Sequence, residues 1–115
     1  MEMKISEMQR LVERFEKMRG WEMFRDSLVY VHLVEEVTEI GRFILENEGY
    51  KRPGLGHSSF EADMGSEFAH VLTLLAQLAN RMGVDMERAL ETELAKMEAR
   101  FPAEKWKKEL EENRG

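Results

Sequence analysis

The stretch His32-Leu33-Val34-Glu35-Glu36-Val37-Thr38-Glu39 decides how the fold of this chain is interpreted. Its apolar spacing is that of an α-helix, which advances about 100° per residue. Glu36 falls in the middle of the apolar stripe of that helix, within about 60° of each of its apolar members. Those members are Val29, Leu33, Ile40 and Phe43, with His32 and Glu39 on one margin. A carboxylate in such a stripe is costly unless it pairs, stays protonated or binds metal.

A second stretch, residues 60–82, repeats this arrangement. Glu67 lies among apolar residues at helical spacing, and Asp63 and His70 lie on the margin of the stripe. The stripe consists of Phe60, Val71, Leu74 and Leu78. The repetition predicts that two acidic helices pack through matching faces.

Packing of the two stripes would bring four side chains to one place. Glu36 and Glu39, like Glu67 and His70, have the i, i+3 spacing that puts two side chains on one helix face. Carboxylates that converge in a dry site repel one another, and a divalent cation is the simplest remedy. An ion pair with Lys or Arg is the alternative for any single Glu, but two matched helices favour metal.

Composition limits the class of protein. The 115 residues fit one domain, 1–115. A composition of 43% hydrophobic and 35% charged residues indicates a folded chain. The formal net charge of −6 argues against a nucleic-acid partner. The absence of cysteine excludes disulfides and thiol catalysis. The N-terminus lacks a signal-peptide apolar region, and no run reaches the roughly 18 to 20 apolar residues of a membrane span. We therefore expect a cytoplasmic protein with no membrane partner.

Good helix formers dominate, and the sequence predicts an all-α, four- to five-helix bundle that is completed by oligomerisation. Gly20 and Gly83 are expected to end helices and Asp85 to begin one. Ser58 or Ser59 is expected to cap the third helix, with Glu61 supporting Ser58. The expected helices are 4–18, a long one entered through 21–24 and ending near 48 or 49, 60–82, 86–100, and a charged tail helix at 103–112.

Residues 49–59 form the one clear loop, rich in Gly and containing Pro53. Its Lys51-Arg52 pair suits a loop beside an anionic ligand, although an ordinary connection is an equal alternative. No phosphate loop of the GxxxxGK[ST] kind is present. Glu67-x-x-His70 matches an element of di-iron bundles, but such bundles use two of these elements and this chain has one.

The acidic stretches also resemble the motifs of the MazG-like, all-α nucleoside triphosphate pyrophosphohydrolases, which include dCTP pyrophosphatases. Residues 33–39 resemble the EExxE motif of this family, and Glu67-Phe68-Ala69-His70 stands where its ExxD motif is expected. The resemblance covers about residues 21–102. It extends through three further segments, Trp21-Glu22-Met23-Phe24, residues 82–90 and Lys96-Met97-Glu98-Ala99-Arg100-Phe101-Pro102.

The resemblance implies an oligomeric helical enzyme, usually a dimer or tetramer. Such an enzyme cleaves a nucleoside triphosphate between the α- and β-phosphates and releases monophosphate and pyrophosphate. By resemblance, magnesium is held by the second and last Glu of EExxE and by both residues of ExxD. These positions are Glu36, Glu39, Glu67 and His70.

Further site residues follow from the same resemblance. Glu35 takes an outer-shell or water-activating role. Lys96 and Arg100 match a basic pair near the phosphates, although salt bridges on a solvated face are the alternative. Trp21 belongs to the pocket that selects the base.

His70 departs from the family pattern, which has Asp. Magnesium prefers hard oxygen ligands, whereas imidazole suits manganese and softer ions. We therefore expect a metal-dependent pyrophosphohydrolase that uses Mg²⁺ or, because of His70, Mn²⁺. Asp63, one turn before Glu67, could supply the missing oxygen. The alternatives are a catalytically retired nucleotide-binding or helical interaction module and, less favoured, a di-iron-type bundle.

Overall fold

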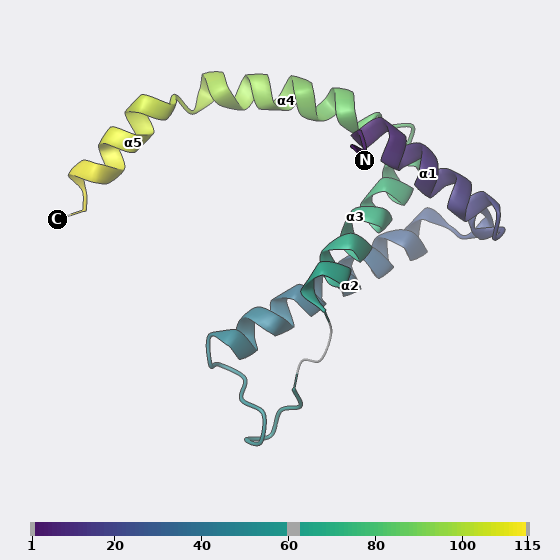
Figure 1. The fold of residues 1–115 in the computed structure, drawn as a ribbon, viewed down its shortest axis with the longest axis horizontal. Helices are drawn as coiled ribbons and strands as arrows, with labels where there is room; N and C mark the ends of the chain where they lie inside the picture. Colours follow the sequence, from purple (N-terminus) through teal and green to yellow (C-terminus); the bar gives the residue numbers. More distant parts are fainter. Residues whose placement is uncertain (1, 60–62, 115) are drawn as a thin grey trace.

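The computed structural model of the chain describes residues 2–59 and 63–114, and within these ranges the fold is all-α. The elements are α1 (Ile5–Lys17), the short 3₁₀-helix η1 (Trp21–Met23), α2 (Asp26–Asn47), α3 (Met64–Arg81), α4 (Met86–Arg100) and α5 (Ala103–Glu112) (Figure 1). None of the described helices is both long and apolar enough to cross a bilayer. The predicted all-α class is confirmed, and completion of the bundle by oligomerisation stays a prediction.

The first, fourth and fifth helices lie within one residue of their predicted bounds. Asp85 caps α4 as expected, because its carboxylate accepts a hydrogen bond from the Arg88 backbone N–H at 3.1 Å. The segment before α2 is different, since it forms a separate 3₁₀ turn. Gly20 with φ 70° precedes this turn and Phe24 with ψ 145° follows it, so the chain changes direction at both ends.

The predicted start of the third helix is wrong. The helix begins at Met64, and Asp63 is its cap, accepting from the Gly65 backbone N–H at 3.2 Å. Neither Ser58 nor Ser59 caps it. The Ser58 hydroxyl instead accepts a hydrogen bond from Arg42 of α2 at 2.8 Å. Two residues of the prediction, Phe60 and Glu61, lie outside the described residues.

The core lies where α1, α2 and α3 pack together. Its buried apolar residues are Val12, Val29, Leu74, Ala76 and Ala79. A buried amide supports this packing, because the Gln9 side chain of α1 donates to the Asn80 side chain at 3.0 Å and to the Val84 carbonyl at 2.9 Å. Gln9 also accepts from the Met86 backbone N–H at 2.8 Å. These bonds fix α1 on the turn between α3 and α4.

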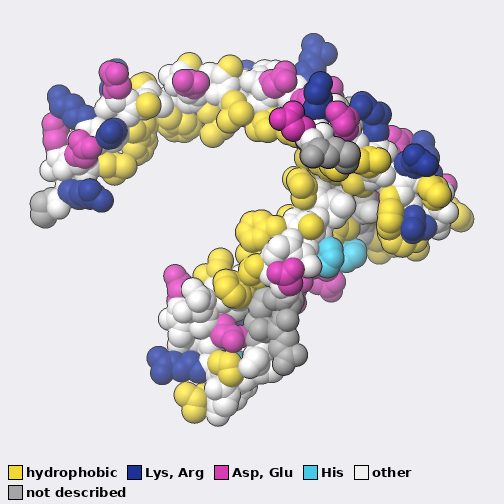
Figure 2. Space-filling view, viewed as in Figure 1, with side chains coloured by type: hydrophobic (Ala, Val, Ile, Leu, Met, Phe, Trp, Pro, Cys, Tyr) yellow, Lys and Arg dark blue, Asp and Glu magenta, His cyan; other side chains and the backbone are white. Residues whose placement is uncertain are grey.

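The last two helices form an arm that leads away from this core (Figure 1). The radius of gyration is 18.9 Å, whereas a compact chain of this length would have about 13 Å. Figure 2 shows apolar side chains along the inner, concave side of the arm. Its exposed large apolar residues are Leu90, Leu94, Met97, Phe101, Trp106 and Leu110.

Candidate functional site

Three side chains from α2 and α3 meet at the contact between these helices. Glu36 of α2 and the pair Glu67 and His70 of α3 each offer a ligand atom, and the three atoms lie within 4.8 Å of one another. The distance from Glu36 Oε2 to His70 Nδ1 is 3.6 Å. Packing of the apolar stripes thus brings together three of the four residues predicted to converge.

Glu67 is the buried member of this acidic cluster (Glu36, Glu67 and His70), with 7% of the residue exposed. Its Oε2 atom is buried and has no hydrogen-bond partner among the described residues. The pKa of Glu67 is raised above its ordinary value by the hydrogen bond with Glu36, by burial and by the Glu36 charge, while His70 opposes the shift. The site therefore holds more negative charge than its own residues neutralise, and it needs a proton or a cation.

The donor set fits a divalent cation. Carboxylate oxygens suit magnesium and manganese, whereas imidazole favours manganese, iron or zinc over magnesium. The orphaned Glu67 oxygen supplies an uncommitted ligand atom at the point where Glu36 and His70 converge.

Two predicted ligands lie outside the acidic cluster. Glu39, one turn further along α2, has its Oε2 3.8 Å from the Arg42 guanidinium, and its charge still contributes to the raised pKa of Glu67. Asp63 is exposed and uses both carboxylate oxygens locally. Besides its bond from Gly65, it accepts from the Ser66 hydroxyl at 3.2 Å.

A second group of possible ligands adjoins the cluster on α2. His32, Glu35 and Glu36 also place ligand atoms within 4.8 Å of one another. His32 Nε2 is 3.4 Å from Glu36 Oε1, so each Glu36 oxygen faces one imidazole. His32 was not predicted as a site residue, although its i, i+4 spacing to Glu36 was a visible signal.

The predicted phosphate-binding residues lie apart from the cluster within one chain. Lys96 and Arg100 are on α4, which leads away from α2 and α3 (Figure 1), and Arg100 covers the Phe101 ring at 4.6 Å. Arg52 donates to the Gly49 carbonyl at 2.8 Å and so closes its own loop. Lys51 lines a polar pocket of about 230 Å³ at the end of α2, together with Arg42, Glu46, Gly56, His57 and Ser58.

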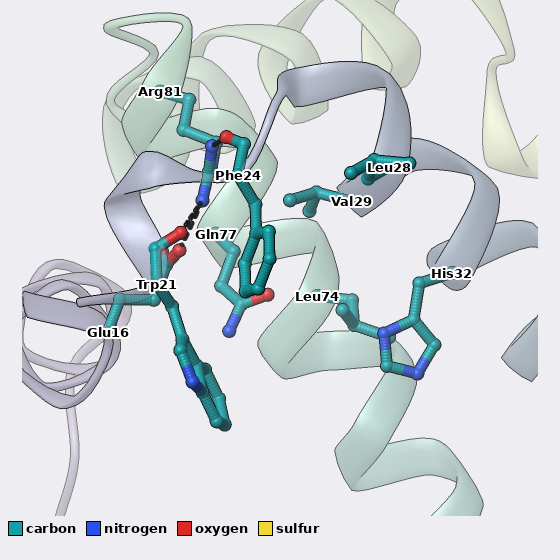
Figure 3. Close-up of a pocket in the computed structure, with 9 residues that line it drawn as sticks. All are labelled: Glu16, Trp21, Phe24, Leu28, Val29, His32, Leu74, Gln77 and Arg81. Atoms are coloured by element: carbon teal, nitrogen blue, oxygen red, sulfur yellow. Dashed lines mark hydrogen bonds and ion pairs between the residues drawn. The ribbon is translucent and has the colours of Figure 1, made fainter. Parts of the chain in front are cut away.

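Two apolar cavities open beside the acidic cluster. The larger has a volume of about 530 Å³ and reaches Glu36 and His70. The smaller, of about 420 Å³, shares four wall residues with it: Trp21, His32, Leu74 and Gln77. The remaining walls are Leu11, Val12, Phe15 and Thr73 in the first, and Glu16, Phe24, Leu28, Val29 and Arg81 in the second (Figure 3).

Arg81 fixes the aromatic wall of the smaller cavity. Its guanidinium donates to the Trp21 carbonyl at 2.8 Å and to the Phe24 carbonyl, so it anchors both ends of η1 on α3 (Figure 3). It also bonds Glu16 Oε2 of α1 at 2.7 Å and lies 3.4 Å from Asp26. Burial alone would lower the pKa of Arg81, but its bonds to Glu16 and Asp26 raise it, so the group stays charged.

The sequence prediction missed this network. Glu16 and Arg81 are 65 residues apart and belong to different helices, so no local pattern pairs them. Trp21 was assigned to the base pocket, and the structure does place it on the wall of both cavities.

The fold and the cluster define a helical protein whose carboxylate and imidazole side chains suit a divalent cation beside an apolar cavity. The family model of the MazG nucleotide pyrophosphohydrolase domain matches residues 25–104. The chain therefore belongs to the MazG nucleotide pyrophosphohydrolase family, and the predicted family is confirmed. A search of curated proteins finds no match.

Proposed function

We propose that the protein is a metal-dependent nucleoside triphosphate pyrophosphohydrolase that releases nucleoside monophosphate and pyrophosphate. The observation that carries this proposal is the buried, unpartnered Glu67 oxygen, which lies beside Glu36 and His70 where the larger cavity opens. Membership of the MazG family supports the reaction class.

Glu36, Glu67 and His70 would hold the metal, and Glu39 lies one turn away on α2. A bound divalent cation would supply charge neutralisation for the phosphates and a more acidic bound water. By family membership the ion is Mg²⁺, while the imidazole of His70 favours Mn²⁺.

The remaining roles belong to side chains of α2 and of the cavity. Glu35 is exposed beside Glu36 and would accept a proton from the attacking water. Attack of that water on phosphorus breaks the bond to the oxygen that bridges the α- and β-phosphates, and pyrophosphate leaves. The apolar walls, which include Trp21 and Phe24, suit the faces of a nucleobase.

We further propose that the active unit is a homodimer or homotetramer. The extended α4–α5 arm leaves its apolar face uncovered, and a second copy of the chain would cover it. Lys96 and Arg100 lie on this arm, so they would approach the phosphates from a partner subunit. This arrangement accounts for a basic pair that does not reach the acidic cluster within its own chain.

The test is a panel of nucleoside triphosphates with Mg²⁺ or Mn²⁺, in which pyrophosphate is measured as product. The proposal predicts metal-dependent pyrophosphate release with at least one nucleotide and none from Glu36→Gln. Orthophosphate as the first product would contradict it. Tight nucleotide binding without turnover would favour a catalytically retired module.

A further inference from the structure

The Gln77 side chain is an uncommitted amide in the shared wall of both cavities. Figure 3 shows it between the rings of Trp21 and Phe24, and no dashed line reaches it. Its amide makes no hydrogen bond within the described part of the chain, whereas Arg81, one turn later on α3, has donors committed to three neighbouring segments. Gln77 therefore offers a free donor and a free acceptor on walls that are mostly apolar.

Such a group is unusual in an apolar cavity. Most buried or half-buried amides are paired, because loss of water without a replacement bond costs free energy. The network of Arg81 holds the backbones of Trp21 and Phe24 in place. The segment that carries the two rings is thus anchored on α3, and the Gln77 amide lies beside it.

The chemistry of this position selects one part of a nucleotide. Aromatic rings stack on a flat ring, and a primary amide presents a donor next to an acceptor. The edges of nucleobases present the complementary pair, whereas phosphate oxygens only accept and belong at the metal. We propose that Gln77 reads the hydrogen-bonding edge of the nucleobase and sets base specificity. This inference rests on the proposed function.

The register of α3 agrees with this placement. Gln77 follows His70 by seven residues, so both lie on the same side of α3, about 10 Å apart along its axis. This span is of the order of one nucleoside. The base would contact Gln77 while the phosphates reach the acidic cluster, and the larger cavity, which touches Glu36, His70 and Gln77, connects the two positions.

The test compares Gln77→Met with Leu28→Met. The first keeps side-chain length but removes both hydrogen-bonding groups, and the second alters the apolar wall of the smaller cavity without touching the amide. Affinities for AMP, CMP, GMP and UMP are measured by calorimetry, alongside kcat/KM for the four triphosphates. We expect Gln77→Met to reduce the ratio between the best and worst base about tenfold or more, the value of one amide–base pair.

Leu28→Met should instead change the affinities for all four monophosphates by similar factors. If wild type binds the four monophosphates equally, or Gln77→Met keeps the wild-type ratio between the best and the worst base, the inference is overturned. Gln77→Ala serves the same comparison if the Met variant does not fold. A different result is that wild type discriminates between bases in a way that depends on Gln77 and still releases no pyrophosphate from any triphosphate. That result would contradict the proposed function but not the role of Gln77 in base recognition.

Discussion

Arg81→Met removes the guanidinium that joins α1, η1 and α3. The change leaves the Glu16 carboxylate, whose side chain is only 7% exposed, without its partner, and frees the carbonyls of Trp21 and Phe24. Breaking a buried ion pair by removing one partner costs about 3–5 kcal/mol. Because the Arg81 side chain is 12% exposed, we expect the lower end, about 3 kcal/mol. At roughly 4 °C per kcal/mol for a domain of this size, the melting temperature should fall by about 12 °C.

Circular dichroism at fixed protein concentration measures this shift. The matched control is Lys17→Met, which breaks the exposed pair of Lys17 and Glu13 at 3.0 Å and should leave the melting temperature unchanged. The melting temperature of the double variant Glu16→Gln with Arg81→Met should fall by less than the sum of the two single decreases. In the double variant the buried charge of Glu16 is removed together with its partner. A melting temperature within about 3 °C of wild type for Arg81→Met would refute the reasoning.

Three further predictions concern the acidic cluster and the arm. Glu67 has a raised pKa in the folded chain, so its contribution to stability is fully present below the ordinary pKa and is lost as pH rises through the folded one. Metal-free Glu67→Gln should therefore melt above wild type at neutral pH, by a margin that narrows on acidification, and an unchanged margin would contradict this. His70→Asp should raise Mg²⁺-supported turnover relative to Mn²⁺-supported turnover, while Asp63→Asn, which keeps a helix cap, should alter neither. If Asp63→Asn is the damaging change, Asp63 belongs to the site. Light scattering at micromolar concentration should give at least a dimer for wild type and a smaller mass for Leu94→Glu, and a wild-type monomer would exclude the proposed assembly.

Local sequence patterns predicted most of the helix bounds and the helix faces, which depend on residues close together in the chain. Helical periodicity gave α1, α4 and α5 to within one residue, and i, i+3 spacing led to the meeting of Glu36, Glu67 and His70. The start of α3 was predicted wrongly because Ser58 looks like a helix cap. Its hydroxyl is used by Arg42, sixteen residues earlier, and Asp63 takes the capping role instead.

The long-range contacts of Arg81 had no sequence signal. Arg81 reaches Trp21 and Glu16 across 60 and 65 residues, and no spacing rule pairs them. The same is true of Gln77, which in the sequence is one more polar residue of an amphipathic helix. Periodicity also shows that α4 has an apolar face but not which surface covers it. For that reason the direction of the arm was not predicted, and Lys96 and Arg100, which were predicted to lie near the phosphates, lie apart from the acidic cluster within one chain.

The most direct test of the metal-dependent reaction follows the products by ³¹P nuclear magnetic resonance. A nucleoside triphosphate is incubated with wild type or Glu67→Gln, with Mn²⁺ and with chelator. Wild type with Mn²⁺ should give monophosphate and pyrophosphate in equal amounts, and both the chelated sample and Glu67→Gln should give neither. Equal pyrophosphate release by wild type and Glu67→Gln, or release that persists in chelator, would contradict the assignment of the reaction to this cluster.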